Sequence, residues 1–354
     1  MTSKIYALHG LRAVAAVLVA ITHLIMRLID YQVVGADWQR FLIAGKAGVY
    51  TFFAVSGLIM IKSSLAHFGK PGAPWKFILR RLIRIVPIYY VFTLLFIVRM
   101  TMVGEPWSAG ELLMSFLFIP YVNPTGLMQP LYGLGWTLNY EMFFYAIFAL
   151  SLFLTRRLGL AVLFTALVAV VGLGLAWGQS LPNGDPQDLL AFYGHPIILF
   201  FIAGMLIGLA PVPVRLSPKI CLLLASALLL GAVLISDPTL TMICCVAAVW
   251  VVSCEKNPET IDAAERSMEF LGEASYSIYL THSFVLGPAV AIGLRLGLFG
   301  TPVGAWGYSV VVIGACVVAG ALAYVVLERP LLSIMRRKLL GGPGKESSTR
   351  EARA

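Results

Sequence analysis

The chain has 354 residues, of which 59% are hydrophobic and 12% are charged, and its formal net charge is +9. Ordinary soluble domains carry about 25% charged residues. The low charge content and the mean hydropathy of +0.88 therefore exclude a soluble domain and indicate a polytopic membrane protein. Because the basic residues are spread over many short loops, we expect them to face anionic lipid rather than nucleic acid.

Long apolar runs recur along the chain, each near the ~20 residues that a hydrocarbon core requires. We predict an all-α protein with about ten transmembrane helices, near residues 8–29, 43–61, 82–103, 136–154, 158–177, 192–210, 219–235, 239–254, 275–298 and 305–327. The first run contains Arg12 and His23 and is read as a retained span rather than a cleaved signal peptide.

Two segments fall outside this series of spans. The run 112–122 contains Pro120 and is too short to cross a bilayer, so we expect it to lie at the interface or to re-enter. We predict that residues 1–339 form one membrane domain and that the polar residues 340–354 form a disordered cytoplasmic tail.

The distribution of basic residues predicts the orientation of the chain. The connection between the second and third spans carries only basic charges, at Lys62, Lys70, Lys76, Arg80, Arg81 and Arg84. Such an excess is typical of cytoplasmic loops, and ten spans then place both termini in the cytoplasm. Three of these bases, Arg80, Arg81 and Arg84, lie at the start of a helix, where guanidinium groups suit the phosphates of either lipid headgroups or a phosphorylated cofactor.

The first span contains two ionisable residues eleven positions apart, Arg12 and His23. Eleven helical steps make three turns plus about 20°, so both side chains lie on one stripe about 16 Å apart. An ionisable residue inside a membrane is costly and usually functional. We therefore expect this stripe to face a protein interior or a wet cavity.

The fourth predicted span carries Glu141 five residues after Trp136, with Tyr145 one turn further on the same face. In the predicted topology, Glu141 and His23 lie at a similar depth, nearer the outer surface. A histidine in a membrane helix often serves only as a hydrogen bond between helices. A carboxylate at matching depth favours a catalytic pair instead, in which the acid fixes and stabilises the imidazole.

Other polar residues within the spans leave two interpretations open. Ser56 is either a covalent nucleophile or, with Gly57, a small pair for close helix packing. Tyr279 and His282 share a helix face and serve either cofactor contact or structural hydrogen bonding. The five cysteines and five histidines lack metal-ligand spacing, and no glycine-rich phosphate loop of the Walker or dinucleotide type is present, so we predict no metal and no ATP hydrolysis.

Six ordered motifs resemble the acyltransferase 3 family, in particular the branch that O-acetylates bacterial exopolysaccharides. The motifs are LHGLRAVAAVLVAITH (8–23), FFAVSGL (52–58), RRLIRIVP (80–87), WTLNYEMFFY (136–145), GEASYSIYLTH (272–282) and LERP (327–330). The chain departs from the family pattern at His9, where an acid is common. The resemblance implies a multi-pass protein of the bacterial inner membrane.

The resemblance also implies a reaction: an acyl group moves from cytoplasmic acyl-CoA, most simply acetyl-CoA, to a hydroxyl of a glycan or lipid-linked saccharide. It makes His23 the general base or a transient acyl carrier, with Glu141 holding the ring. The implied cofactor contacts are Arg12, Arg80, Arg81, Arg84, Tyr279 and His282, and the implied acceptor contacts are Ser56, Trp136, Asn139 and Tyr145. A secondary transporter or flippase of an anionic or glycolipid solute is the competing interpretation, and a membrane scaffold or sensor is a third.

Overall fold

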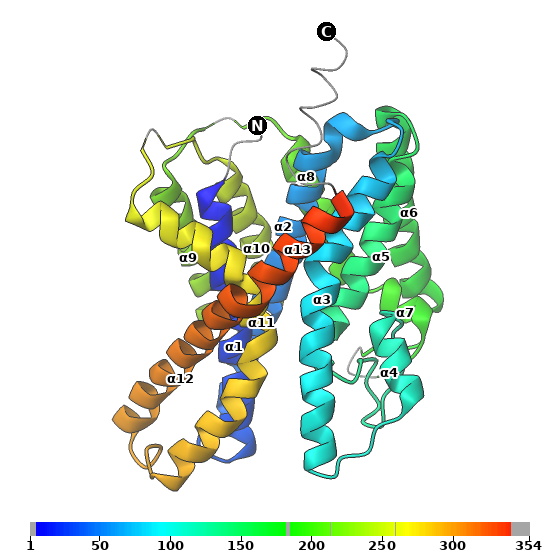
Figure 1. The fold of residues 1–354 in the computed structure, drawn as a ribbon. Coiled ribbons are helices and arrows are strands. Elements are labelled where there is room, and N and C mark those ends of the chain that lie inside the picture. The colour runs from blue at the N-terminus through cyan, green and yellow to red at the C-terminus, as the bar shows by residue number, and fades with distance from the viewer. Residues whose placement is uncertain (1–4, 182–184, 213, 259, 341–354) are drawn as a thin grey trace. The chain divides into compact units, whose positions relative to one another are not determined.

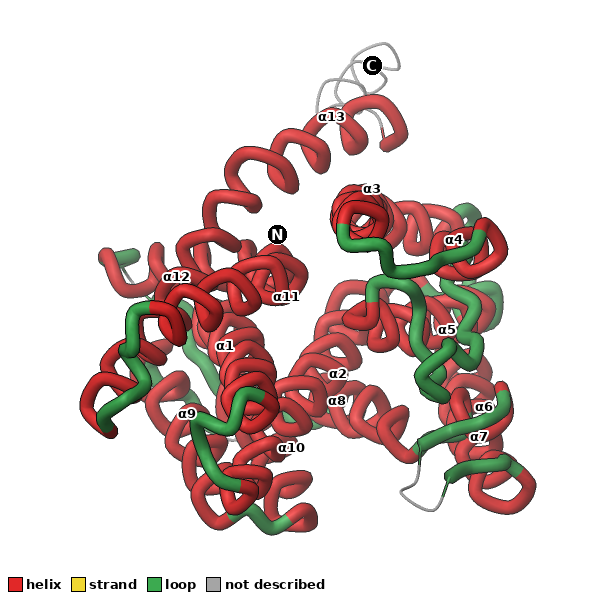
Figure 2. Tube along the Cα trace, turned by 90° about the horizontal axis from the view of Figure 1, so that it is seen from below, coloured by secondary structure: helices red, strands yellow, loops and turns green. Residues whose placement is uncertain are grey.

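The computed structural model describes residues 5–181, 185–212, 214–258 and 260–340. Within these ranges the regular structure is helical, and strand-like pairing is limited to three isolated bridges (Figures 1 and 2). The predicted all-α class is confirmed. The predicted tail, apart from Leu340, lies outside the described residues.

Eight helical segments in the described ranges are long and apolar enough to cross a membrane, and one of them, Leu189–Leu209, is made of three shorter helical pieces. Two other predicted spans form helices of only 16 residues, α5 (Trp136–Ser151) and α10 (Pro238–Ser253). At 1.5 Å per residue each is about 24 Å long, short of a hydrocarbon core of about 30 Å. The chain is therefore a multi-pass membrane protein in which all ten predicted segments contain helix and eight meet the length and composition of a full span.

The chain forms two compact units, the first made of Met1–Ser63 and Leu199–Tyr324. Its helical segments are α1 (Tyr6–Asp30), η1 (Ala36–Leu42), α2 (Ile43–Ser64), α8 (Leu199–Leu209), α9 (Pro218–Ile235), α10, α11 (Ala263–Arg295) and α12 (Pro302–Ala323). Helix α1 packs along α11 and also contacts α9, α10 and α12, so it is the central helix of this unit (Figure 2).

Glycines let the helices of the first unit approach closely. A Cβ on Gly272 of α11 would overlap the backbone of His9 on α1, and a Cβ on Gly57 of α2 would overlap the carbonyl oxygen of Phe201. A side chain at either position would force the helices apart. This contact supports the packing interpretation of the Ser56–Gly57 pair.

Helix α11 begins earlier than predicted. The predicted span starts at residue 275, but the helix starts at Ala263 after a capping box in which Asp262 and Glu265 satisfy each other's backbone N–H groups. Its first turns are polar, so a search for apolar runs does not detect them. The 33-residue helix therefore places His282 well inside the unit rather than near the start of a span.

The second unit is made of Ser64–Ile198 and Val325–Ala354. Its helical segments are η2 (Leu65–His67), α3 (Ala73–Met102), α4 (Ala109–Phe116), η3 (Gly133–Gly135), α5, α6 (Arg156–Trp177), α7 (Leu189–Tyr193), η4 (Pro196–Ile198) and α13 (Arg329–Leu340), and the π-helical segment η5 (Tyr324–Glu328) joins the two units in sequence. Helix α3 contacts both α5 and α13. The eight-residue α4 agrees with the prediction that this run does not cross the membrane.

Helix α13 was not predicted, because it is amphipathic and contains no long apolar run. Arg336, Arg337 and Lys338 lie in its last turns, while Leu332 is buried. A helix with one apolar and one basic face is typical of a segment that lies along a surface rather than across a membrane.

Candidate functional site

Two histidines from different helices meet inside the first unit. Nε2 of His282 on α11 lies 3.1 Å from Nδ1 of His23 on α1, and the two ring centroids are 5.0 Å apart. The same Nδ1 of His23 lies 3.0 Å from the carbonyl oxygen of Val19, one turn earlier on α1. His282 is 0% exposed, whereas His23 is partly buried. One nitrogen of His23 therefore has two partners.

The two contacts determine where the hydrogens lie. A carbonyl oxygen can only accept, so His23 must carry its hydrogen on Nδ1 and donate it to Val19. The opposite tautomer would set the lone pair of Nδ1 against the carbonyl oxygen at 3.0 Å. With Nδ1 protonated, Nε2 of His282 must be the acceptor, and the hydrogen of His282 lies on its own Nδ1. This assignment leaves the Nε2 lone pair of His23 available for chemistry.

The histidine pair is enclosed by side chains of the same unit. The Tyr279 ring lies 6.0 Å from that of His282 and packs edge-on against Phe52 of α2 at 6.2 Å. Cys316 of α12 contacts the carbonyl oxygen of His282. These contacts come from three helices, so they hold His282 against α1 in one orientation.

Other predicted residues of the first unit lie on the same helices. Arg12 is on α1, partly buried and eleven residues before His23. Ser56 is partly buried on α2, next to Gly57. Neither residue is among the contacts of the histidine pair described above.

A second cluster lies inside the second unit and joins α3 to α5. The Arg81 guanidinium lies 5.5 Å from the ring centroid of Phe77 and 5.9 Å from that of Tyr145. Tyr145 makes a side-chain hydrogen bond with Glu141, and the Glu141 charge acts on Arg81. The predicted shared face of Glu141 and Tyr145 is confirmed by this contact.

Several polar atoms of this unit are buried without a hydrogen-bond partner among the described residues. They include Nε of Arg81, Nη2 of Arg84 and both amide atoms of Asn139, whose side chain is 1% exposed. Buried polar groups are nearly always hydrogen bonded, so such atoms need an explanation. Arg80, in contrast, is exposed, and Trp136 packs edge-on against Tyr140 at 5.9 Å.

The structure thus gathers the predicted residues into two groups. His23 lies with His282 in the first unit, and Glu141 lies with Tyr145 and Arg81 in the second. The His23–Glu141 pair stays a prediction.

The contact between His23 and His282 was not predicted, although the sequence contains a signal for it. Counted from the helix starts at Tyr6 and Ala263, the two histidines lie 17 and 19 residues along their helices. At 1.5 Å per residue both are about 25 to 29 Å deep. The depths of the two histidines therefore agree once the polar start of α11 is counted as part of the helix.

No metal site is present among the described residues. These contain no group of three or more His, Cys, Asp or Glu side chains placed to hold an ion. All five cysteines are buried and free, as expected of residues that serve in packing.

Comparison with known proteins points to one class of enzyme. A family model described as an acyltransferase domain (Acyl_transf_3) matches residues 5–327. The chain is also 35% identical over 309 residues to the exopolysaccharide production protein ExoZ of Rhizobium meliloti (strain 1021), an alignment that covers 81% of this chain and 90% of that protein. No solved structure matches the chain.

Proposed function

The chain belongs to the acyltransferase 3 family, and from this premise we propose that it is an inner-membrane O-acyltransferase of exopolysaccharide biosynthesis. The donor is cytoplasmic acyl-CoA, with acetyl as the acyl group, and the acceptor is a hydroxyl of an exopolysaccharide or a lipid-linked glycan. The similarity to ExoZ, named for exopolysaccharide production, supports the acceptor class. The observation that carries the chemistry is the His23–His282 pair.

In the proposed mechanism, His23 is the general base. Its free Nε2 removes the proton of the acceptor hydroxyl while the hydroxyl oxygen attacks the thioester carbonyl carbon. The carbon–sulfur bond then breaks, and the CoA thiolate takes the proton from the imidazolium. Positioned proton transfer of this kind contributes roughly a hundred- to ten-thousandfold in rate.

His282 acts through His23 in this mechanism. Its Nε2 accepts the hydrogen bond from Nδ1 of His23, which holds the reactive tautomer and the orientation of the ring. When His23 gains the acceptor proton, the same neutral acceptor and the Val19 carbonyl stabilise the positive charge. His282 thus has the orienting role that a carboxylate has in a serine protease triad, which replaces the cofactor contact expected for it from sequence.

The charged residues of the site are proposed to bind the donor and to support the base. Arg12, Arg80, Arg81 and Arg84 are assigned to the CoA phosphates, and the buried nitrogen atoms of Arg81 and Arg84 support this assignment because an anion would give them partners. Glu141 is assigned as the acid that supports His23 in the reaction. Its hydrogen bond with Tyr145 supports a fixed carboxylate.

The remaining residues are assigned to the substrates by their family motifs. Tyr279 contacts the donor, while Ser56, Trp136, Asn139 and Tyr145 contact the acceptor. Asn139 has the strongest structural support, since both of its buried amide atoms are without hydrogen-bond partners among the described residues.

A direct assay tests the proposed class. Purified protein in detergent is given acetyl-CoA and a crude membrane glycolipid fraction, and the release of free CoA is measured for wild type, His23→Ala and the control His67→Ala. His67 is exposed in η2, so its replacement should leave release unchanged. We expect acceptor-dependent release that falls roughly a hundred- to ten-thousandfold in His23→Ala and is unchanged in His67→Ala. Absence of release from folded wild-type protein with any short acyl-CoA would favour the transporter instead.

The acyl-carrier alternative needs a separate experiment. Protein incubated with radiolabelled acetyl-CoA without acceptor, then quenched, should carry no label if transfer is direct. Label that is retained by wild type and lost in His23→Ala would establish an acyl-His23 intermediate.

A further inference from the structure

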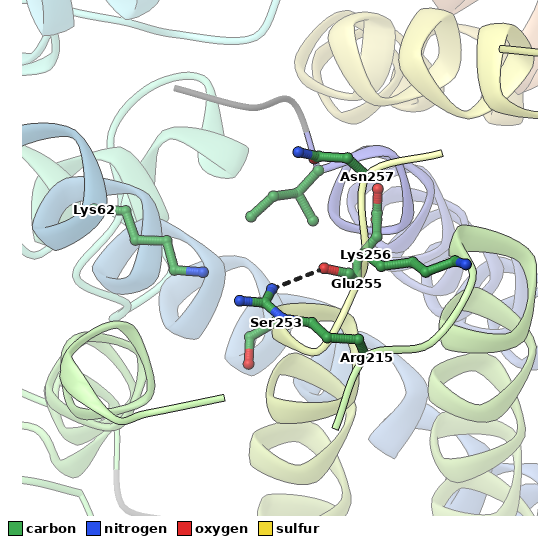
Figure 3. A pocket seen from close by; sticks show the side chains of 7 residues that line it. Lys62, Arg215, Ser253, Glu255, Lys256 and Asn257 are labelled. Carbon is green, nitrogen blue, oxygen red and sulfur yellow. Dashed lines mark hydrogen bonds between the residues drawn. The ribbon is translucent and has the colours of Figure 1, made fainter. Parts of the chain in front are cut away.

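A basic cavity lies at one end of the first unit, apart from the histidine pair. Its volume is about 280 Å³, and it opens where α1 begins and where α2 and α10 end (Figure 3). Three of the residues that line it are cations, Lys62, Arg215 and Lys256. The predicted topology places this end of the unit in the cytoplasm.

The loops around the cavity hold Arg215 in place. The backbone N–H of Leu216 donates to the carbonyl of Cys254 at 2.9 Å, and the N–H of Lys256 donates to the carbonyl of Leu216 at 2.8 Å. The Arg215 guanidinium donates to the carbonyl oxygen of Glu255 at 3.1 Å. This short pairing therefore fixes the backbone on both sides of the cavity.

Glu255 is the one acidic residue in the described lining, and its carboxylate is engaged elsewhere. Its two oxygens accept the backbone N–H groups of Tyr6 at 2.9 Å and Ala7 at 2.7 Å, at the start of α1. These are N–H groups that a helix cannot satisfy itself. Burial raises the pKa of the Glu255 carboxyl, while these hydrogen bonds and the charge of Lys62 oppose the rise. The Glu255 carboxylate therefore caps the N-terminus of α1, although Glu255 is far from α1 in the sequence.

The two cations nearest to each other face the same space. Figure 3 shows the Lys62 ammonium and the Arg215 guanidinium pointing toward each other, while the Lys256 side chain points away. Like charges at close range repel each other, and an anion between them would reverse the sign of the interaction. Guanidinium and ammonium groups both donate charge-assisted hydrogen bonds to phosphate oxygens.

We propose that Lys62 and Arg215 form a binding site for a phosphate group at the cytoplasmic end of the first unit. The cavity is slightly smaller than a typical small-molecule site of about 300 to 1,000 Å³. It therefore suits one phosphate group of a larger molecule rather than a whole nucleotide. The ligand is either acyl-CoA, a source that rests on the proposed function, or an anionic phospholipid, which does not.

The position of the cavity along α1 fits the acyl-CoA source. His23 lies 17 positions after Tyr6, which is at the cavity end of α1, and this corresponds to about 25 Å at 1.5 Å per residue. Arg12 lies between them on the same helix. A phosphate held at the cavity would leave the rest of CoA to extend past Arg12 toward the base.

The first arm of the test measures CoA binding. The full chain is placed in nanodiscs of phosphatidylcholine alone and titrated calorimetrically with CoA and with CoA lacking its 3′-phosphate. We expect Lys62→Gln and Arg215→Gln to weaken CoA binding roughly tenfold each, whereas Arg215→Lys, which keeps the charge, retains it. The control Arg156→Gln removes an exposed base at the start of α6 and should change nothing.

The second arm measures lipid binding. The temperature of unfolding is compared between nanodiscs of phosphatidylcholine alone and nanodiscs that also contain phosphatidylglycerol. Unchanged CoA binding, with stabilisation by phosphatidylglycerol that is lost in Lys62→Gln, would assign the site to a lipid headgroup. Lys62 lies at the exposed end of α2, so this variant stays informative if Arg215→Gln fails to fold.

Unchanged CoA binding and unchanged lipid stabilisation in Lys62→Gln would overturn the site. Failure of the proposed function is read separately, from the absence of CoA release by wild-type protein. In that case a lipid effect that depends on Lys62 would still support the phosphate site.

Discussion

The unit built around α1 and α11 contains a pair of histidines joined through one ring hydrogen. In the second unit, helices α3 and α5 instead bring together partly buried charged residues. His23 and His282 are oriented by a carbonyl and by each other. Arg81, Glu141 and Tyr145 are held by charge and by aromatic contacts. The first arrangement suits the movement of a proton, and the second suits the recognition of an anion.

The difference also shows in what each group leaves unsatisfied. In the tautomer assigned above, Nε2 of His23 keeps a free lone pair, and the buried Nδ1 of His282 has no hydrogen-bond partner among the described residues. In the second unit, buried nitrogens of Arg81 and Arg84 have no hydrogen-bond partner among the described residues. A base needs a lone pair and a phosphate site needs donors, so each group suits the role proposed for it.

The largest effect among single substitutions outside His23 is expected at Glu141. Glu141→Gln removes the negative charge but keeps the shape, so we expect turnover to fall roughly a hundredfold or more without loss of folding. Turnover is measured as CoA release, using protein that elutes as a single species in size-exclusion chromatography. Glu105→Gln, in an exposed loop, is the control. Full turnover of Glu141→Gln would remove this residue from the catalytic group.

The next effect is expected at His282, which separates the orienting role from cofactor contact. His282→Phe should lower kcat roughly 10- to 100-fold with little change in the KM for acetyl-CoA, because it removes the acceptor of the His23 hydrogen bond. His282→Gln offers an amide oxygen as acceptor and should recover part of the rate. A raised KM for acetyl-CoA with unchanged kcat would instead indicate that His282 contacts the cofactor.

A smaller effect, on KM rather than on turnover, is expected in the second unit. Arg81→Gln and Arg84→Gln should each raise the KM for acetyl-CoA roughly tenfold through the loss of a charge-assisted hydrogen bond. Arg80 is exposed, and Arg80→Gln should raise the KM less. The assignment of Arg81 and Arg84 to the donor would be contradicted by variants that lower kcat at unchanged KM.

The smallest effect on activity is expected at Ser56. If this residue serves packing, Ser56→Ala should change the rate less than about twofold. Its neighbour gives the contrast, since Gly57→Ala would place a Cβ on the Phe201 carbonyl oxygen and should destabilise the protein by about 1 to 3 kcal/mol. Thermal unfolding and CoA release measure the two variants. A Ser56→Ala variant that is stable but inactive would instead support Ser56 as a covalent nucleophile.

The predicted helices follow from hydropathy, because membrane spans are defined by long apolar runs. The same rule fails at the polar start of α11 and at α13, whose amphipathic pattern leaves no apolar run to detect. The missed start displaced His282 from its true depth. With this boundary wrong, the predicted depth of His282 did not match that of His23.

Site residues were predictable where one helix carries both members. The Glu141–Tyr145 contact follows from their spacing of four on α5. Contacts between helices are different, since His23 with His282 and Glu255 with the start of α1 join residues more than 240 positions apart. Periodicity carries no information about such pairs, and only the packing of the helices reveals them.

The central claim is that His282 works only through His23, and a double-mutant cycle on CoA release tests it most directly. Turnover is compared for wild type, His23→Ala, His282→Phe and the double variant. We predict that His282→Phe slows the wild-type enzyme but has no further effect in the His23→Ala background. Losses that multiply in the double variant would show that the two histidines act independently, and would contradict the proposed pair.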